Sequence, residues 1–187
     1  MNLILASQSA SRRTMLQAAG VSFDAMTAIG DEEIAKQALR AKNLGAPELA
    51  SALASFKAYD LSLRFPDKLI LGCDQTLECD DGSMIDKAVD RDDAAQILGR
   101  LSGKTHHLHS AATILHGGVP IWQHRESVEM TMRPLSGAFI DAYLDKEWAQ
   151  CRWCVGCYRI EGPGAQLFSA ISGSQFAIQG LPLLPLL

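Results

Sequence analysis

Apolar and polar residues follow two different periods along the chain, and each period predicts one type of element. Helical spacing of apolar positions predicts helices over residues 12–19, 32–42, 48–64 and 94–101, and from a cap at Ser136 to Glu147. Apolar or alternating runs predict strands over residues 3–5, 21–29, 69–73, 106–115 and 121–132. Because strands are interspersed with helices and hairpins, the pattern indicates an α/β fold with a mixed sheet.

The fully apolar run at Leu69–Cys73 differs from the other predicted strands. A run without alternation is typical of a central strand that is buried on both faces. We expect this strand to end at Asp74. Ligands of open α/β sheets bind beyond the carboxyl ends of the strands, so Asp74 is a candidate functional carboxylate. An aspartate that serves only in a turn is the alternative, and the pattern leaves it open.

The stretch LASQSASRR, residues 5–13, lies where the first strand gives way to the first helix, and it holds three serines and two arginines. Small hydroxyl residues at such a junction cap the helix or hold an anion against backbone N–H groups. The guanidinium groups of Arg12 and Arg13 suit phosphate because their donors form a planar fork. A serine cap followed by a solvated basic turn explains the same residues without a ligand.

Composition limits the classes of function. The chain has 187 residues, 48% hydrophobic and 20% charged, as in an ordinary globular protein of one domain or two joined lobes. A net charge of −4 argues against a nucleic-acid partner, which requires a broad basic face, but allows a polyanion held by a few cations. The apolar runs are too short for a signal peptide or a membrane span, so we expect a cytoplasmic protein.

Two clusters match metal sites only in part. Cys151, Cys154 and Cys157 have the spacing of three iron–sulfur ligands, but Glu161 stands where the fourth cysteine is required. The odd total of five cysteines also favours free thiols, which we expect to be buried on a strand. The histidines among residues 106–109 alternate between the faces of a strand, which is poor geometry for one metal ion.

Two short motifs point to phosphate chemistry, and each fails at one position. LILGCDQT, residues 69–76, resembles the start of a haloacid-dehalogenase phosphatase, but Thr76 replaces the second aspartate, which is the general acid there. GKT at residues 103–105 matches the end of a phosphate-binding P-loop, but Leu98 replaces the required glycine. Both motifs are therefore set aside.

Several charged residues have ordinary explanations when each is taken alone. Asp31, Glu32 and Glu33 place favourable negative charge before a predicted helix. Lys57 lies within an amphipathic helix and Lys87 follows a predicted hairpin, and a single lysine of either kind is more typical of solvated surface.

Taken in order, the motifs form one series: LASQSASRRTMLQAAG, Asp31-Glu32, ASFKAYDL, LILGCDQTLECDDGSMIDK, RLSGKTHHLHSA, GCYRIEG and GLPLLPLL. This series resembles the Maf family of nucleoside triphosphate pyrophosphatases over nearly the whole chain. The resemblance implies a single Maf-like domain over residues 1–187. The implied fold is Maf/ITPase-like, with a mixed central β-sheet flanked by helices and two lobes around a deep cleft. The implied reaction is hydrolysis of a nucleoside triphosphate to the monophosphate and diphosphate with a divalent metal cation, Mg²⁺ or Mn²⁺.

The resemblance also assigns roles to residues by position. Asp74 is expected to be the catalytic proton acceptor, and Glu32, with Asp31 beside it, is expected to share a metal ion with Asp74. The residues expected to bind the triphosphate are Ser7, Ser9, Arg12, Lys57 and Lys87. The chemistry is consistent, since these cations offset the charge of a triphosphate on an acidic protein and carboxylate oxygens suit a hard metal ion.

Three positions depart from the common family pattern, and in the family they are linked to the choice of base. Ser11 stands where the family loop has an arginine, Gln75 where a threonine usually follows the catalytic aspartate, and Glu161 where the family has a glutamine. Gln75 and Glu161 resemble the branch that acts on 7-methyl-GTP, but that branch has a tryptophan at the position of Ser11. We therefore expect a guanine-type or 7-methyl-GTP preference from a partial match.

Two other functions stay open from the sequence. One is a non-catalytic nucleotide-binding regulator of cell division, and the other is a phosphatase that releases orthophosphate. The expected partner is a nucleoside triphosphate, with no nucleic acid and no membrane, and a homodimer stays open as well. The physiological nucleotide and the preferred metal do not follow from the sequence.

Overall fold

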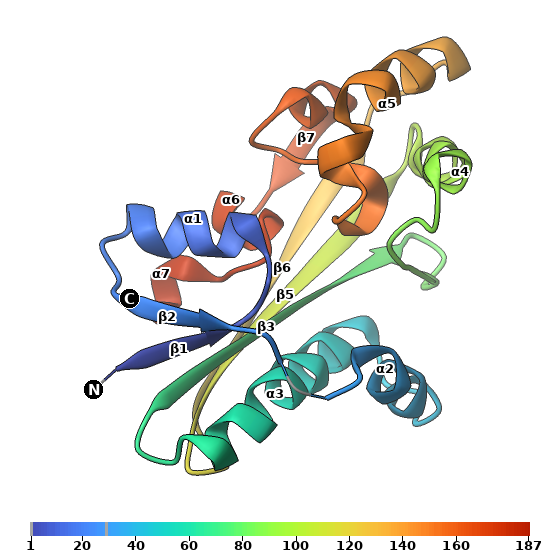
Figure 1. The fold of residues 1–187 in the computed structure, drawn as a ribbon. Helices are drawn as coiled ribbons and strands as arrows, with labels where there is room; N and C mark the ends of the chain where they lie inside the picture. Colours follow the sequence, from blue (N-terminus) through green and yellow to red (C-terminus); the bar gives the residue numbers. More distant parts are fainter. Residues whose placement is uncertain (1, 29) are drawn as a thin grey trace. The chain divides into compact units, whose positions relative to one another are not determined.

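The computed structural model describes residues 2–28 and 30–187 as a mixed α/β fold (Figure 1). In its seven-stranded sheet, β2-β1-β3-β5-β6-β7 lie in that order and β4 pairs with β3. The strands are β1 (Leu3–Ala6), β2 (Phe23–Met26), β3 (Leu69–Cys79), β4 (Met84–Ile85), β5 (Thr105–His116), β6 (Val119–Met132) and β7 (Phe168–Ser172). The pair β1–β3 is parallel and the pair β6–β7 is antiparallel, which confirms the predicted mixed sheet.

Helices occupy most of the connections between the strands. They are α1 (Ala10–Ala18), α2 (Glu32–Arg40), α3 (Ala46–Arg64), α4 (Arg91–Leu101), α5 (Gly137–Cys151), α6 (Gln175–Ile178) and α7 (Leu183–Leu186), with the 3₁₀ turns η1 (Val155–Cys157) and η2 (Pro163–Leu167). None of the helices in the described residues is both long and apolar enough to cross a lipid bilayer.

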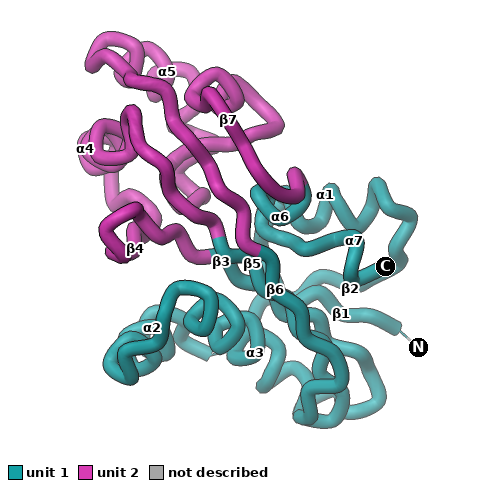
Figure 2. The backbone as a smooth tube through the Cα atoms, turned by 180° about the vertical axis from the view of Figure 1, so that it is seen from behind, with its two compact units in different colours: residues 1–75, 109–126, 176–187 teal, residues 76–108, 127–175 magenta. Residues whose placement is uncertain are grey.

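The chain divides into two compact units, which Figure 2 distinguishes by colour. Within the described residues, unit 1 comprises residues 2–28 and 30–75 together with His109–Glu126 and Phe176–Leu187. Unit 2 comprises Thr76–Leu108 and Ser127–Gln175. The long strands β3, β5 and β6 each contribute residues to both units, and the two units are described separately below. Whether residues 1–187 act as one domain stays a prediction.

Unit 1 packs helices against both faces of its part of the sheet. Successive residues of a strand point to opposite faces, and two core clusters follow this alternation. The cluster on the side of α1 and the C-terminal segment contains Leu5, Met15, Leu16, Leu71, Cys73, Ala112, Leu181 and Leu183. The cluster on the side of α3 contains Ile4, Ala6, Ala58, Leu61, Ile70 and Leu115. In Figure 1, α1 and α3 accordingly lie on opposite sides of β1 and β3.

A glycine allows α3 to approach β3 closely. A Cβ atom on Gly72 would stand 2.0 Å from the carbonyl oxygen of Ala54 and 3.0 Å from the Cβ of Ala58. Any other residue would push the helix away from the strand. Gly72 therefore allows a short distance between α3 and β3 in the part of α3 that carries Lys57.

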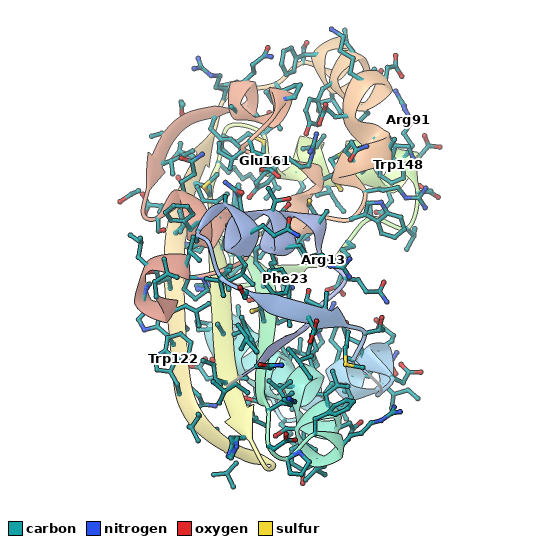
Figure 3. The ribbon with its side chains drawn as sticks, turned by 60° about the vertical axis from the view of Figure 1, so that its left-hand side comes forward. Arg13, Phe23, Arg91, Trp122, Trp148 and Glu161 are labelled. Atoms are coloured by element: carbon teal, nitrogen blue, oxygen red, sulfur yellow. The ribbon has the colours of Figure 1, made fainter. Side chains whose placement is uncertain are left out.

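Unit 2 pairs β6 with β7 and packs α4 on α5. Arg91 at the start of α4 donates to the Oδ1 of Asp145 on α5 at 2.6 Å, on the side of the unit where Figure 3 labels Arg91 and Trp148. Within this unit, the Nε2 of His106 lies 2.7 Å from the hydroxyl of Tyr158, and both rings pack against Phe168. These buried aromatic rings attach the segment after α5 to the sheet.

The prediction that the apolar strand ends at Asp74 is wrong. β3 continues to Cys79, because Leu77 and Glu78 find antiparallel partners in β4. The parallel pairing with β1 nevertheless stops at Leu71, so Asp74 lies beyond the region that β1 covers.

The predicted helices are present with different ends. α1 begins at Ala10 instead of residue 12, because the side chain of Ser9 caps it. α2 ends at Arg40 instead of residue 42, α3 begins at residue 46 instead of 48, α4 begins at Arg91, and α5 runs beyond Glu147 to residue 151. The second strand covers only Phe23–Met26 of the predicted 21–29, and Ile29 lies outside the described residues.

The clustered cysteines do not lie on a strand, contrary to the prediction. Cys151 ends α5, while Cys157 lies in η1 with a φ of 58° next to Gly156 with a φ of 75°. Two successive positive φ values turn the chain sharply and are incompatible with extended structure. The predicted free thiols are confirmed, and burial raises the pKa of Cys151 to about 11 and that of Cys157 to about 12.

Candidate functional site

A buried lysine joins two carboxylates in unit 1. The Nζ of Lys57 lies 2.5 Å from the Oδ1 of Asp74 and 2.9 Å from the Oε1 of Glu32. Lys57 and Asp74 are both buried, whereas the Glu32 side chain is half exposed. The structure thus brings together three of the residues that the sequence assigned to catalysis, metal binding and triphosphate binding. An ion pair this deeply buried is uncommon away from functional sites.

The local sequence determines which acidic residue reaches Lys57. Asp31 is the N-cap of α2, and its carboxylate accepts hydrogen bonds from the backbone N–H groups of Glu33 and Ile34. Capping of this kind satisfies amide groups that a helix leaves unpaired at its start. Asp31 is therefore engaged in the cap, and the next residue, Glu32, makes the contact with Lys57.

The junction between β1 and α1 has the features of an anion-binding turn. Ser9 caps α1 by accepting a hydrogen bond from the backbone N–H of Arg12, and the backbone N–H of Ser9 donates to the Oγ of Ser7 at 3.2 Å. Ser11 follows in the first turn and is half-buried. The start of a helix presents backbone N–H groups and a partial positive charge, which together favour an anion.

Arg12 is buried, so the alternative of a solvated basic turn does not apply to it. Its Nε donates to the carbonyl oxygen of Gly180 at 2.7 Å, and its Nη1 donates to the Oγ of Ser7 at 3.2 Å. Arg13 is half-buried and reaches the carbonyl of Ser7 with Nη2. A fixed guanidinium beside small hydroxyl groups suits a phosphate oxygen.

The thiol of Cys73 lies within the electrostatic influence of both cations, Arg12 and Lys57. Burial raises the pKa of this thiol to about 11, and the positive charges of Arg12 and Lys57 act in the opposite direction. Asp74 raises the pKa further. The thiol therefore stays protonated at neutral pH, and Cys73 serves as core rather than as a nucleophile.

Gln75 makes hydrogen bonds that the sequence did not foresee. Its Nε2 lies 2.9 Å from the Oγ of Ser110, 2.9 Å from the carbonyl oxygen of Ala177 and 3.0 Å from that of Ile178. Ser110 donates to the same Ala177 carbonyl at 2.6 Å. Gln75 thus attaches α6 to the sheet. The role of Gln75 in the choice of base stays a prediction.

Lys87 and Glu161 belong to unit 2 and are described within it. Lys87 is exposed and follows β4. Glu161 is exposed between η1 and η2 and is labelled in Figure 3. Nearby, the Nη2 of Arg159 donates to the buried Glu147 at 2.9 Å, and this bond raises the pKa of Arg159, with Glu161 adding to the shift. The roles assigned to Lys87 and Glu161 stay predictions.

Two carboxylates of unit 1 form the donor set for the predicted metal ion. Mg²⁺ is often bound by only one or two carboxylates together with substrate phosphates and water. Glu32 and Asp74 supply hard oxygen donors that converge on one point, where the ammonium of Lys57 lies. Among the described residues, no group of three or more His, Cys, Asp and Glu side chains could hold a metal ion. The donor set therefore fits an ion held jointly with phosphate rather than a metal held by protein alone.

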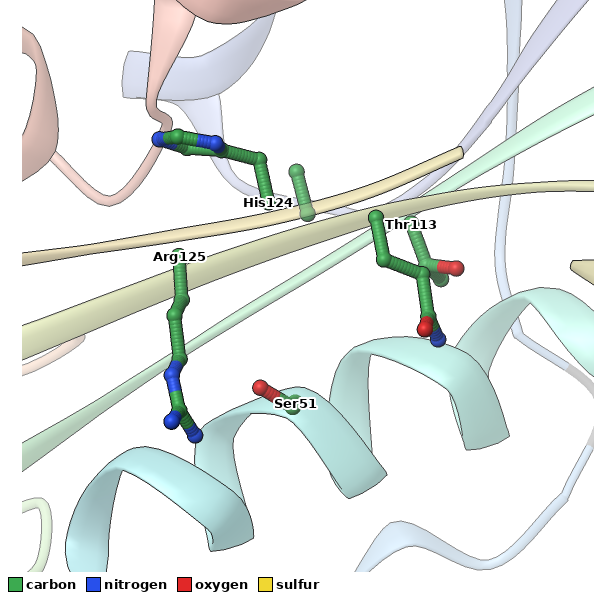
Figure 4. A pocket seen from close by; sticks show the side chains of 6 residues that line it. Ser51, Thr113, His124 and Arg125 are labelled. Carbon is green, nitrogen blue, oxygen red and sulfur yellow. The ribbon is translucent and has the colours of Figure 1, made fainter. Parts of the chain in front are cut away.

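A separate pocket of about 480 Å³ in unit 1 is lined by Ser51, Ala112, Thr113, Gln123, His124 and Arg125. Figure 4 shows Arg125 and Ser51 on the α3 side of the sheet and His124 on the other side. Arg125 is held by Glu48 at 2.7 Å, and His124 stacks on Trp122. Both side chains thus contact residues of the protein outside the pocket lining, and the pocket is a weaker candidate than the Lys57 cluster.

Sequence reasoning missed two supporting groups of the candidate site, the carbonyl of Gly180 and the hydroxyl of Ser110. The glycine opens the segment GLPLLPLL, but in the sequence it indicated only a turn. Nothing in the sequence pairs it with Arg12, from which it is separated by 168 positions. Such long-range contacts follow from the fold and not from local pattern.

Comparison with known proteins identifies the family. A family model described as Maf-like protein matches residues 2–187. A nucleoside triphosphate pyrophosphatase of Sphingopyxis alaskensis is 45% identical over 187 residues, covering 100% of this chain and 94% of that protein. A 7-methyl-GTP pyrophosphatase of Rhizobium johnstonii is 44% identical over 185 residues, covering 99% of this chain and 92% of that protein.

Among solved structures, a nucleoside-triphosphatase/dITP/XTP pyrophosphatase of Mycobacterium abscessus is similar with a TM-score of 0.45 and 15% identity, covering 72% of this chain and 76% of that one. The family assignment rests on sequence: the Maf-like model spans nearly the whole chain, and the relatives named above are matched over more than nine-tenths of their length. The chain therefore belongs to the Maf family.

Proposed function

We propose that this protein is a nucleoside triphosphate pyrophosphatase, which hydrolyses a nucleoside triphosphate to the monophosphate and diphosphate. The observation that carries the proposal is the buried contact of Lys57 with Asp74 and Glu32 in unit 1. The relatives in Sphingopyxis alaskensis and Rhizobium johnstonii, which carry the names nucleoside triphosphate pyrophosphatase and 7-methyl-GTP pyrophosphatase, support it.

Asp74 is the proposed proton acceptor. A carboxylate at hydrogen-bond distance from a water molecule orients it and takes its proton as the oxygen attacks phosphorus. Lys57 holds the Oδ1 of Asp74 at 2.5 Å, which fixes the direction of the carboxylate. The same ammonium offsets negative charge as the diphosphate leaves, a contribution that strengthens where the site excludes water.

The β1–α1 junction is the proposed phosphate-binding turn. Ser7 and Ser9 allow a phosphate to approach the backbone at the start of α1, and the buried Arg12 supplies a fixed cation. Lys87 is proposed as a second triphosphate-binding lysine on the basis of the family pattern. Lys87 is exposed in the structure.

Glu32 and Asp74 are the residues that would hold a divalent cation, Mg²⁺ or Mn²⁺. When bound, such an ion would neutralise negative charge on the phosphates and make the attacked phosphorus atom more electrophilic. Lys57 contacts both of these carboxylates and would add a second positive charge to the same cluster. Removal of divalent cations with a chelator should therefore stop turnover and leave the fold intact.

We propose a guanine-type base as the preferred nucleobase, with Glu161 as the residue that recognises it. A carboxylate accepts two hydrogen bonds from the adjacent N1–H and amino group of guanine, whereas uracil and thymine offer one N–H between two carbonyl oxygens. A methyl group on N7 makes the ring cationic and strengthens the bond. Ser11 provides no aromatic surface to stack on the base, so we expect a modest preference.

A panel of nucleoside triphosphates with Mg²⁺ or Mn²⁺ tests the main proposal when the products are identified. Diphosphate and monophosphate are expected from the wild type, and Asp74→Asn should lower kcat by a factor of about 100 or more. Release of orthophosphate instead would favour a phosphatase. Nucleotide binding without any product would favour a regulator. Near-normal turnover of Asp74→Asn would exclude Asp74 as the proton acceptor.

The base proposal needs its own comparison. The kcat/KM values for GTP, 7-methyl-GTP, UTP and dTTP should rank the guanine-type nucleotides first, and Glu161→Gln should reduce their lead. Glu129→Gln, an exposed change on β6, is the matched control. A wild type that prefers UTP or dTTP, or an unchanged ranking in Glu161→Gln, would contradict the assignment.

A further inference from the structure

The amide of Gln75 has its orientation fixed by its neighbours. Two of the three acceptors around Nε2 are the carbonyl oxygens of Ala177 and Ile178, which can only accept hydrogen bonds. Exchanging the amide nitrogen and oxygen would place the side-chain oxygen against both carbonyls. Both amide hydrogens are therefore committed to this network, and only Oε1 remains for another donor.

Gln75 also points away from its catalytic neighbour. Side chains at successive positions of a strand lie on opposite faces of the sheet. Asp74 contacts Lys57 on α3, on one face, while Gln75 contacts α6 and Ser110 on the other. Ala112, two positions from Ser110 on β5, lies in the core cluster on this second face.

The turn that Gln75 attaches carries the partner of Arg12. The backbone N–H of Gly180 bonds to the carbonyl of Ala177, the carbonyl acceptor that Gln75 shares with Ser110. The carbonyl of Gly180 in turn accepts the Nε–H of Arg12 at 2.7 Å. A continuous path of hydrogen bonds therefore runs from Gln75 through the turn at residues 177–180 to the guanidinium of Arg12.

We infer that Gln75 is a positioning residue for phosphate binding: it holds the turn at residues 177–180, whose Gly180 carbonyl orients Arg12. The ligand class is the polyphosphate part of the substrate and not its base. This inference rests on the proposed function in one respect, the role of Arg12 as a phosphate ligand. Loss of the Gln75 donors releases the turn, and Arg12 then loses a fixed direction rather than its charge.

The inference differs from a role in base choice in what it predicts. If Gln75 acts on Arg12, replacement of Gln75 lowers the affinity for all nucleoside triphosphates by a similar factor. It also lowers the affinity for a ligand that has no base. If Gln75 contacts the base, a ligand without a base is unaffected and the ranking of nucleotides changes. Inorganic tripolyphosphate separates the two cases because it keeps the phosphates and lacks the nucleoside.

The test variant is Gln75→Glu, which keeps the shape and replaces the donating amide with a carboxylate facing two carbonyl oxygens. Gln75→Met, which has similar length and no charge, serves if the first variant does not fold. Gln123→Glu is the matched control, since Gln123 is exposed on β6 and donates only weakly to Ser55 at 3.3 Å. Folding is checked by circular dichroism and the thermal midpoint before any binding measurement.

Titration calorimetry with tripolyphosphate is the decisive measurement. We expect Gln75→Glu or Gln75→Met to weaken binding by about 10-fold, as a small displacement of a binding group can, and Gln123→Glu to leave it unchanged. The KM values for GTP and UTP should rise by one common factor. In an Arg12→Ala background the same Gln75 change should have little further effect, because the two residues act as one unit.

Each outcome decides the inference. Normal tripolyphosphate affinity in the folded Gln75 variants, or additive effects of the Gln75 and Arg12 changes, would overturn it. So would a wild type that does not bind tripolyphosphate. Diphosphate release is measured on the same wild-type preparation. Coupled loss of tripolyphosphate binding in a protein that releases no diphosphate would support this inference and contradict the proposed function.

Discussion

Each unit buries a pair of polar side chains in contact, and the two pairs differ in charge. Unit 1 buries the ammonium of Lys57 against the carboxylate of Asp74 and holds the guanidinium of Arg12 on a carbonyl oxygen. Unit 2 buries His106 and Tyr158 as a hydrogen-bonded pair of rings. Burial lowers the pKa of His106 to about 4, so this imidazole is neutral at physiological pH.

The difference separates a functional cluster from a structural one. Burying charged groups is costly, and an ion pair often contributes less to stability than apolar residues of the same volume would. Its presence in unit 1 is therefore better explained by chemistry than by stability. A neutral, hydrogen-bonded pair of rings costs far less to bury and strengthens packing, which is the expected role of His106 and Tyr158.

The largest expected effect comes from removing the buried lysine. Lys57→Met keeps the length of the side chain but leaves Asp74 without its cation. We expect kcat/KM to fall by a factor of about 100 or more, because a group that stabilises charge in the transition state is lost. We also expect a loss of about 3 kcal/mol in the free energy of unfolding, since a buried carboxylate is left unpaired.

The matched control is Lys87→Met, at an exposed lysine of unit 2. Its effect on stability should stay within about 0.5 kcal/mol, as for most surface changes, while its proposed phosphate role lowers kcat/KM. Urea unfolding and steady-state kinetics measure both quantities. If Lys57→Met retained wild-type kcat/KM, the distinction between a functional and a structural cluster would fail.

The second prediction breaks the close packing that brings Lys57 to Asp74. Gly72→Ala places a Cβ atom 2.0 Å from the Ala54 carbonyl oxygen, where only movement of α3 can relieve the clash. We expect a loss of stability of about 3 kcal/mol or more together with loss of activity.

Gly99→Ala, within α4 and without a heavy atom within 4 Å of the added Cβ, is the control. It should leave stability unchanged or slightly raised, because alanine is the better helix former. Thermal midpoints of the two variants test the prediction. Equal midpoints would mean that α3 does not need to lie so close to β3.

The elements of the fold were largely predictable because their signals are local. The helical periods were sufficient to place α1 to α5, and the runs predicted as strands over residues 106–115 and 121–132 lie within β5 and β6. The ends were less predictable, since they depend on caps and pairing partners. Asp74 lies inside a strand because β4 extends β3, and no pattern before Asp74 reveals a partner that comes later in the chain.

The candidate site was predictable only where a residue type is itself informative. A charged residue after an apolar run marked Asp74, and serines before a helix indicated a cap, which the structure places at Ser9. The contact of Lys57 with Glu32 depends on how α2 and α3 meet, and the bond of Arg12 to Gly180 depends on the path of the C-terminal segment. Local patterns carry no information on either.

The third prediction tests the neutral state of His106. Its pKa is about 4 in the folded protein against about 6.5 in an unfolded chain, so the unfolded state binds the proton first as pH falls. The contribution of His106 to stability is therefore complete above about pH 6.5 and is lost as pH falls towards 4. The total loss is up to about 3 kcal/mol.

Urea unfolding at a series of pH values from 7 to 4 measures this decline. His106→Gln should flatten the part of the decline that His106 causes, at the cost of lower stability at pH 7. His107→Gln, a change at the half-buried neighbouring position, should keep most of the decline, because burial lowers the pKa of His106 more than the charge of His107 does. An unaltered profile in His106→Gln would show that this ring does not govern the acid stability of the protein.

The smallest expected effect concerns the support of Arg12 by the C-terminal turn. Gly180 has a φ of 92°, and an added Cβ would stand 3.1 Å from the Nη2 of Arg12. Gly180→Ala should lower the free energy of unfolding by about 1–2 kcal/mol because of the positive φ, and should also shift the guanidinium of Arg12.

Gly20→Ala is a close control, because Gly20 has a φ of 73° and nothing within 4 Å of an added Cβ. Both variants should therefore lose similar stability in urea unfolding, but only Gly180→Ala should weaken the binding of tripolyphosphate. Equal binding by both would show that Arg12 tolerates displacement, and unit 1 would then need only the charge of this residue and not its direction.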